Sequence, residues 1–144
     1  MSVTPIPEGF HTVTPYLTVD NAQSLIDFIQ QALDGKLAYR MNDDQGNVRH
    51  AEMKIGDSMI MIGQARDEWH PKPTNLVLYV PDCDAIYKKA LAAGATVVRE
   101  MATQAYGDRS GGVQDSEGNT WWISTHVEDV SPEEMERRMK AGAK

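Results

Sequence analysis

The sequence predicts an α+β fold built from two βαβββ modules, each with one helix and four strands. Residues 17–41 and residues 78–101 repeat one order of elements: an apolar strand, an acidic helix start, an amphipathic helix, a glycine and a further strand. Two more strand-like runs follow each of these segments. A repeat of this kind within a short chain indicates two similar halves that share one sheet surface, with a cleft where the halves meet.

The first module is predicted at residues 11–64. Residues 13–19 alternate apolar and polar side chains, which is the period of a half-buried strand. Residues 22–33 place their apolar side chains on one helical stripe, and Gly35 can end this helix in the left-handed conformation. The remaining strands are expected at residues 36–41, 48–55 and 58–62, the last two joined by a tight turn at Gly56-Asp57.

The second module is predicted at residues 75–129, after a polar linker at residues 65–74 that carries Pro71 and Pro73. Its elements are expected in the same order: a strand at 75–80, a helix at 82–93, a strand at 96–101, a glycine-bearing loop at 103–112, and short strands at 113–115 and 120–125. In residues 130–144, Ser131-Pro132-Glu133-Glu134 predicts the start of a short C-terminal helix. We therefore expect a single domain over residues 1–144.

Composition limits the classes of partner. The formal net charge is -7, which argues against binding to nucleic acid or to an anionic membrane, since both favour dense patches of lysine and arginine. No apolar run approaches the roughly 20 residues that span a bilayer. The first residues lack the basic and apolar regions of a signal peptide. The lone cysteine, Cys83, cannot form an internal disulfide, so a cytoplasmic location is expected.

The alternation of the strands also predicts which side chains face the cleft. In the first strand Val13, Leu17 and Val19 are expected to pack on the helix. The expected cleft lining is aromatic, thioether-rich and partly polar, and consists of Thr14, Tyr16, Thr18, Met59, Met61, Asn75, Val77, Tyr79, Thr120, Trp122 and Ser124. Such a lining suits an organic ligand with an apolar body better than a bare anion.

The chain resembles the vicinal oxygen chelate superfamily, the group of glyoxalases, bleomycin-resistance proteins and extradiol dioxygenases, over about residues 11–129. More closely it resembles the PhnB-like branch. The segments that carry this resemblance are Thr14-Pro15-Tyr16-Leu17, His50-Ala51-Glu52, Tyr106-Gly107-Asp108-Arg109-Ser110-Gly111, Asp115 through Gly118-Asn119-Thr120-Trp121, and Thr125-His126-Val127-Glu128-Asp129. The resemblance implies a cup-shaped mixed or antiparallel sheet with helices outside. It also implies a homodimer, in which some family members exchange halves.

Many members of this family hold one divalent metal ion in the cup through four His, Glu or Gln positions. Aligned on the family's strands and on the turn at residues 115–118, this chain has Thr14 and Asn75 at the two early positions. Met61 falls near the third position and Trp122 at the fourth. None of these side chains supplies an imidazole or a carboxylate. We therefore expect that the usual metal site is absent and that no other cofactor is used.

Several polar side chains are candidates for chemistry. His50 and Glu52 share one face of a strand, so they could act as an acid–base pair, form a cross-strand polar pair at the rim, or supply two metal ligands in an unusual place. Arg109, in a loop beside the cup that begins at Tyr106, could grip a carboxylate or phosphate on a ligand, or it could hold the loop through an ion pair with Asp108 or with a glutamate. His126, near Glu128 and Asp129, could belong to a polar cluster that follows the last strand, or it could be a metal ligand.

These observations leave three functions open. The first is a protein that binds a small, partly apolar organic molecule in its cup without the usual metal. The second is a metal-free enzyme that uses His50 and Glu52, with Tyr16 or Tyr106 assisting. The third is a metal-dependent lyase, isomerase or dioxygenase with unexpected ligands. The fold hosts all of these activities, so fold alone does not choose among them.

Overall fold

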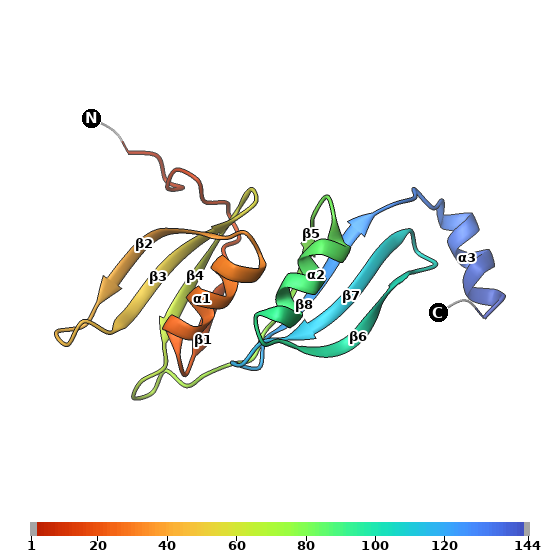
Figure 1. Cartoon of the computed structure of the whole chain (residues 1–144). Helices are drawn as coiled ribbons and strands as arrows, with labels where there is room; N and C mark the ends of the chain where they lie inside the picture. Colours follow the sequence, from red (N-terminus) through yellow and green to blue (C-terminus); the bar gives the residue numbers. More distant parts are fainter. Residues whose placement is uncertain (1–2, 143–144) are drawn as a thin grey trace.

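The computed structural model describes residues 3–142, and the ends of the predicted 1–144 domain lie outside this range. It confirms two βαβββ modules and a C-terminal helix (Figure 1). The first module contains β1 (Tyr16–Val19), α1 (Ala22–Ala32), β2 (Lys36–Asn42), β3 (Val48–Ile55) and β4 (Ser58–Gln64). The second contains β5 (Asn75–Tyr79), α2 (Cys83–Ala92), β6 (Thr96–Thr103), β7 (Asp108–Gln114) and β8 (Thr120–His126), and α3 (Pro132–Lys140) follows.

The two modules share one topology. The first sheet has the strand order β1-β4-β3-β2 and the second has the order β5-β8-β7-β6. In each sheet the first strand of the module pairs in parallel with the last, and the other pairs are antiparallel. The strands thus form two separate mixed sheets, each open and cup-like, and β1 and β5 are outer strands.

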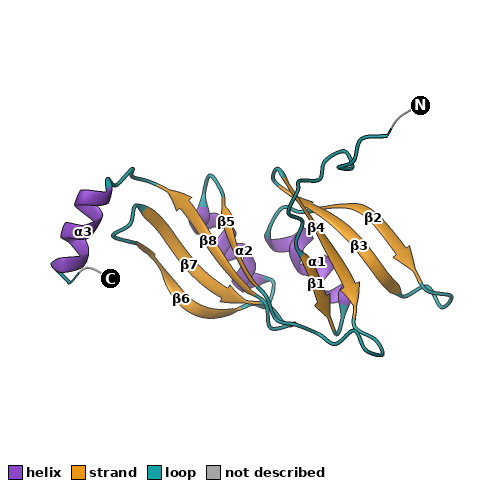
Figure 2. Cartoon of the chain, turned by 180° about the vertical axis from the view of Figure 1, so that it is seen from behind, coloured by secondary structure: helices purple, strands orange, loops and turns teal. Residues whose placement is uncertain are grey.

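One helix covers one face of each sheet. Figure 2 shows both sheets in front of their helices, so the uncovered faces of the two sheets lie on the same side of the chain. The apolar stripe of α1 is buried, and Leu17, Val19, Met53 and Ile62 of the first sheet are buried with it. In the second module α2 buries Ile86 and Tyr87, while Trp121 and Ile123 of β8 are fully enclosed.

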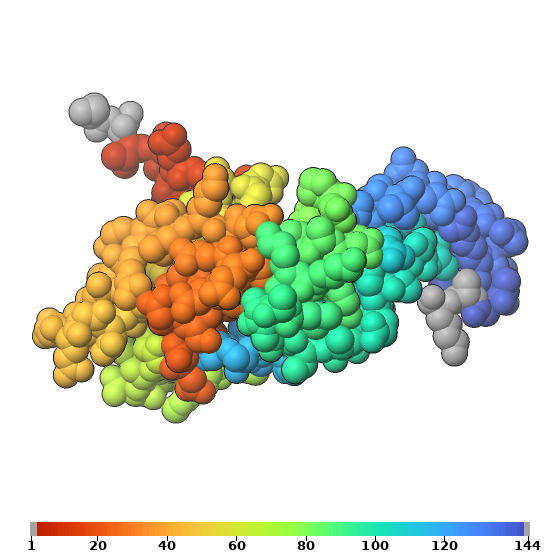
Figure 3. Space-filling model, viewed as in Figure 1, coloured from red at the N-terminus to blue at the C-terminus, as the bar shows by residue number. Residues whose placement is uncertain are grey.

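The two modules meet along their helices (Figure 3). The Phe28 ring of α1 lies 6.3 Å from the ring of Trp121 in the second module. The backbone N–H of Asn21 donates to Glu117 at 2.8 Å, and the hydroxyls of Ser24 and Ser116 are 3.0 Å apart. At the other end, Lys89 of α2 forms an ion pair with Asp34. These contacts hold the sheets side by side, so the uncovered faces do not face each other.

Two strand predictions need correction. β1 starts at Tyr16 rather than at residue 13, and Val13 is 83% exposed instead of packing on the helix. β7 starts at Asp108, so most of the predicted loop at 103–112 is strand. Gly111 and Gly112 lie within this strand, where they leave room for neighbouring rings instead of forming a turn. A Cβ at Gly111 would lie 2.8 Å from the Tyr87 ring, and one at Gly112 would lie 2.5 Å from the Trp122 ring.

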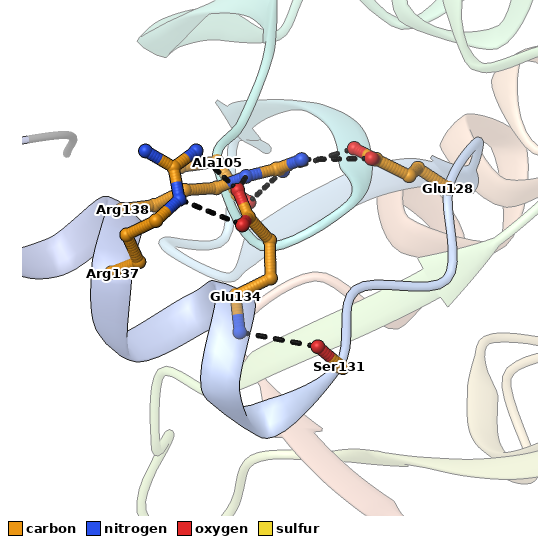
Figure 4. A network of polar contacts seen from close by, with 6 residues as sticks. All are labelled: Ala105, Glu128, Ser131, Glu134, Arg137 and Arg138. Atoms are coloured by element: carbon orange, nitrogen blue, oxygen red, sulfur yellow. Dashed lines mark hydrogen bonds and ion pairs between the residues drawn. The ribbon is translucent and has the colours of Figure 1, made fainter.

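The C-terminal helix α3 begins as predicted and is tied to the second module by ion pairs (Figure 4). The Ser131 hydroxyl accepts the backbone N–H of Glu134 at 3.1 Å, which caps the helix. Arg138 donates to Glu128 at 2.8 Å and 3.0 Å, to Glu134 at 2.8 Å and to the carbonyl of Ala105 at 2.7 Å. Arg137 and Arg138 together lower the pKa of Glu134 to about 2. None of the helices within residues 3–142 is both long and apolar enough to cross a membrane.

The internal repeat extends to one turn in each module. Asp43 accepts the backbone N–H groups of Gln45 and Asn47, each at 2.9 Å, and Asp115 accepts those of Glu117 and Asn119 at 2.9 Å and 3.0 Å. Only Asp115 is buried, and it also accepts the indole N–H of Trp121 at 2.8 Å. The second turn is therefore joined to the core, whereas the first lies on the surface.

We expect Asp115→Ala to lower the free energy of unfolding by about 3 kcal/mol, because it leaves the buried indole N–H and two backbone N–H groups without their acceptor. Asp43→Ala is the matched control. It removes the equivalent acceptor from an exposed turn where water can replace it, so about 1 kcal/mol is expected. Denaturant unfolding of both variants measures the two losses, and equal losses would contradict this account.

Candidate functional site

The uncovered face of the first sheet, the first open face, carries two rows of side chains. The β-ladder places Tyr16 beside Met61, Met61 beside Glu52, and Glu52 beside Tyr39. The next row runs through Thr18, Gly63, His50 and Met41. The structure thus brings together the predicted residues Tyr16, His50, Glu52 and Met61, and it adds Tyr39, which the sequence analysis did not single out.

His50 stands at the centre of this face. Its Nε2 lies 3.4 Å from Glu52 Oε2, and both side chains are mostly shielded from solvent. The rings of Tyr16 and Tyr39 lie 5.8 Å and 6.4 Å from the His50 ring. The Tyr16 ring lies against Gly63, since a Cβ there would be 2.8 Å from the Tyr16 ring. The glycine therefore provides the space in which the tyrosine lies.

Two other predicted residues of the first module lie at the margin. The hydroxyl of Thr14 donates to the carbonyl of His11 at 3.1 Å, just before β1 begins. Met59 is buried, and a Cβ at Gly9 would lie 3.7 Å from its methyl carbon. The segment before β1 thus covers Met59, and this side chain is less available to a ligand than the alternation of β4 predicts.

The uncovered face of the second sheet, the second open face, centres on Trp122. The Trp122 ring lies over Gly112, and the Arg99 guanidinium carbon lies 5.0 Å from the ring centroid. The Trp122 indole N–H reaches Asn75 Oδ1 at 3.4 Å. Val77 is directly opposite Trp122 in the β-ladder. Asn75 and Trp122 thus lie together, as predicted, on an aromatic surface with polar groups at its margin.

A polar network lies at one end of the second open face. The Tyr79 hydroxyl donates to Asp108 at 2.7 Å, and His126 Nδ1 lies 2.8 Å from the other oxygen of Asp108. His126 Nε2 lies 2.7 Å from Asp129. The hydrogen bonds to Asp108 and Asp129 raise the pKa of His126, which favours the imidazolium. The hydrogen bond to Asp108 also raises the pKa of Tyr79, with burial and the charges of Asp108 and Tyr106 adding to the effect.

Arg109, predicted as a residue that could bind an anionic group of a ligand, binds an acidic residue of α2 instead of facing the cup. Arg109 is in β7, where Asp108 and Ser110 point to the open face and Arg109 points to the helix side. Its guanidinium binds Asp84 of α2 through two hydrogen bonds of 2.8 Å and 2.9 Å. Arg109 thus ties β7 to α2 through Asp84, rather than through Asp108 or a glutamate as the alternative prediction had it. Tyr106 precedes β7 in a turn and is partly exposed near Tyr79.

Two cavities adjoin these faces. One, of about 670 Å³, lies between the first open face and the linker, and is lined by Tyr16, Thr18, Arg49, Gly63, Gln64, Arg66, Glu68, Trp69, His70 and Lys72. The other, of about 780 Å³, lies between the modules and is mostly apolar; its lining includes Pro15, Leu33, Ile60, Leu76, Leu78 and Tyr79. We call the first of these the linker cavity.

The residues at the family's metal positions do not suit a divalent ion. Thr14, Met61, Asn75 and Trp122 offer no imidazole and no carboxylate. Across residues 3–142, no three His, Cys, Asp or Glu side chains are grouped so that they could hold a metal. His50 and Glu52 together supply only two potential metal ligands. Both ring nitrogens of His126 are engaged in hydrogen bonds, one with Asp108 and one with Asp129. The absence of a metal stays a prediction about the protein in solution.

The pH dependence of stability should report on His126. The pKa of His126 is raised in the folded protein, so protonated His126 stabilises the fold. This stabilisation is complete when the pH is below 6.5, the ordinary pKa of histidine, and it is lost as the pH rises through the raised pKa of the folded protein. We expect His126→Gln to destabilise the protein most at pH values below about 6.5, with the difference shrinking on the alkaline side. Unfolding curves of both proteins at several pH values measure this, and a constant difference would contradict it.

Comparisons with known proteins agree with this architecture. The model of the glyoxalase/bleomycin resistance protein/dioxygenase superfamily matches residues 9–123. An uncharacterized protein of Mycobacterium bovis is 31% identical over 140 residues, which cover 90% of this chain and 92% of the relative. An uncharacterized protein of Mycobacterium tuberculosis shows the same identity, with 90% and 82% covered.

Solved structures show the same fold. TioX from Micromonospora sp. ML1 has a TM-score of 0.71 at 21% identity, with 81% of this chain and 99% of that chain covered. The PhnB protein from Bacillus cereus has a TM-score of 0.62 at 15% identity, with 80% and 99% covered. The family model spans both modules and all the strands described above except the end of β8. The chain therefore belongs to the glyoxalase/bleomycin resistance protein/dioxygenase superfamily.

Proposed function

We propose that this protein binds a small, partly apolar organic molecule between its open faces and that it does so without the usual metal ion. The observation that carries this proposal is the exposure of large apolar and aromatic side chains there: Tyr16 is 54% exposed, Tyr39 50%, Val77 59% and Tyr79 65%. Surface aromatic residues gathered in this way mark binding sites more often than chance exposure. Asn75 and Glu52 place polar groups among them.

We propose further that the site is completed by a second copy of the chain. A single chain holds its two open faces side by side on one surface, so they cannot enclose a ligand between them. β1 and β5 are outer strands, and such edges favour pairing with another chain. In this homodimer the first open face of one copy lies over the second open face of its partner. The lone, buried Cys83 fits a reducing compartment, and we place the protein in the cytoplasm.

Acid–base catalysis by His50 and Glu52 is a second candidate function. The observation that favours it is the 3.4 Å contact between the imidazole and the carboxylate in the middle of the first open face. A carboxylate in this position can orient the ring and raise its basicity. The test is whether Glu52→Gln abolishes turnover of a bound compound while the variant still binds that compound. This result would show that the protein is an enzyme rather than a protein that only binds its ligand.

The binding proposal predicts that the neutral probe phenylnaphthylamine binds and changes the emission of Trp122. Trp122→Ala and Tyr16→Ala should each weaken binding by about tenfold or more, because each removes a large buried contact. Leu37→Ala is the control, since Leu37 is exposed on the helix side of the same sheet, beside Met53. Calorimetric titration measures the affinities. Equal weakening by all three variants, or no binding by the wild type, would contradict the proposal.

The dimer proposal predicts that light scattering gives a mass close to twice 16.0 kDa at micromolar concentration. Val77→Glu should shift the mass toward that of one chain, because it places a charge on an exposed position of an edge strand that would be covered in the dimer. Val127→Glu, at an exposed position after the end of β8, is the matched control. A wild-type mass of one chain would contradict the proposal.

A further inference from the structure

We propose that the linker cavity recognises an acidic group on the ligand, so that the ligand of this protein is an aromatic carboxylic acid or a similar flat anion. This inference rests on the proposed binding function and adds the charge class of the ligand. The cavity opens beside Tyr16, which belongs to the first open face, so one molecule can contact both. Its volume of about 670 Å³ is within the range of small-molecule sites.

The charge of the cavity wall is opposite to that of the whole molecule. The chain has a formal net charge of -7, yet Arg49, Arg66 and Lys72 line this cavity with only one carboxylate, Glu68. Asp43 and Asp44 border a smaller hollow of about 270 Å³ next to it, which Arg49 and Arg66 also line. Within residues 3–142 the three cations form no ion pair with these or other acids. Their charges are therefore available to a ligand.

Hydrogen bonds fix the backbone that carries Arg66 and Lys72. Arg66 and Trp69 exchange two backbone hydrogen bonds of 3.0 Å and 2.7 Å, which close a tight turn. Asp67 in this turn has a φ of 48°, in the left-handed region that non-glycine residues seldom adopt. The linker is also tied to β1, because the N–H of Ala65 donates to Val19 at 2.8 Å and that of Lys72 donates to Thr18 at 3.1 Å. The cations thus stand at a fixed edge of the first sheet.

Aromatic surfaces complete the cavity. Tyr16 lies against Gly63 on one side, and the ring of Trp69 is largely exposed on the linker side. A flat ring can contact these surfaces while its acidic group meets a guanidinium, which binds a carboxylate through two parallel hydrogen bonds. Arg49 adds a second guanidinium. It is the extra residue where the β2–β3 ladder shifts between Met41–His50 and Asn42–Val48, which brings its side chain toward the cavity.

Calorimetric titration with naphthalene carboxylate and with the matching neutral carboxamide tests this inference. We expect the carboxylate to bind about tenfold more tightly, as a charge-assisted hydrogen bond predicts. Arg49→Gln combined with Arg66→Gln removes both guanidinium groups, so it should remove most of this preference and leave the affinity for the carboxamide unchanged. Lys88→Gln, on the exposed side of α2, is the matched control and should leave both affinities unchanged. Thermal unfolding confirms that each variant is folded.

Equal affinity of the wild type for the two compounds would overturn the inference, and so would a preference that survives the double variant. Either result leaves the binding proposal standing, because the neutral compound still binds. If neither naphthalene compound binds while phenylnaphthylamine does, the charge class is wrong and the binding function stands. If none of the three binds, the proposed function itself fails. The preference should also weaken as the salt concentration rises.

Discussion

Each four-stranded sheet in this protein has two faces but only one helix, and most of the structure follows from that constraint. The helix buries one face with Leu17, Ile62, Trp121 and similar side chains. The other face keeps its side chains in solvent unless another part of the assembly covers it. Because α1 and α2 pack against each other, the two open faces point the same way and cannot cover one another. A protein with this arrangement is suited to bind a ligand, a second copy, or both.

The open faces are preorganised for contact. Gly63 and Gly112 lack a side chain where the rings of Tyr16 and Trp122 lie, so each sheet presents an aromatic surface, over β4 in the first module and over β7 in the second. The polar groups are mostly held by partners within the chain: Asp108 accepts from Tyr79 and lies against His126, and the Ser124 hydroxyl pairs with that of Ser110 at 2.9 Å. The cations of the linker cavity differ, since they have no such partner within the described residues. This difference is why we assign them to the ligand.

The sequence predicts most of the framework because local patterns decide it. The alternation in β1 and the apolar stripe of α1 depend on neighbouring residues, so Leu17, Val19 and the helix boundaries were found. The prediction of a loop at residues 103–112 was wrong because its glycines do not mark a turn. Gly111 and Gly112 leave room for the rings of Tyr87 and Trp122, which are distant in sequence. That error also misplaced Arg109, whose direction depends on where β7 begins. The contact of His126 with Asp108 depends on strand register, which no local signal sets.

In the proposed homodimer, one ligand site uses the first open face of one chain and the second open face of another. Co-refolding Tyr16→Ala with Trp122→Ala tests it directly, because a mixed dimer would contain one site with both changes and one site with neither. Statistical mixing then predicts that about a quarter of all sites bind phenylnaphthylamine with wild-type affinity. Each variant refolded alone should show none. If the mixture binds no better than the separate variants, the faces that form a site belong to the same chain and the account is wrong.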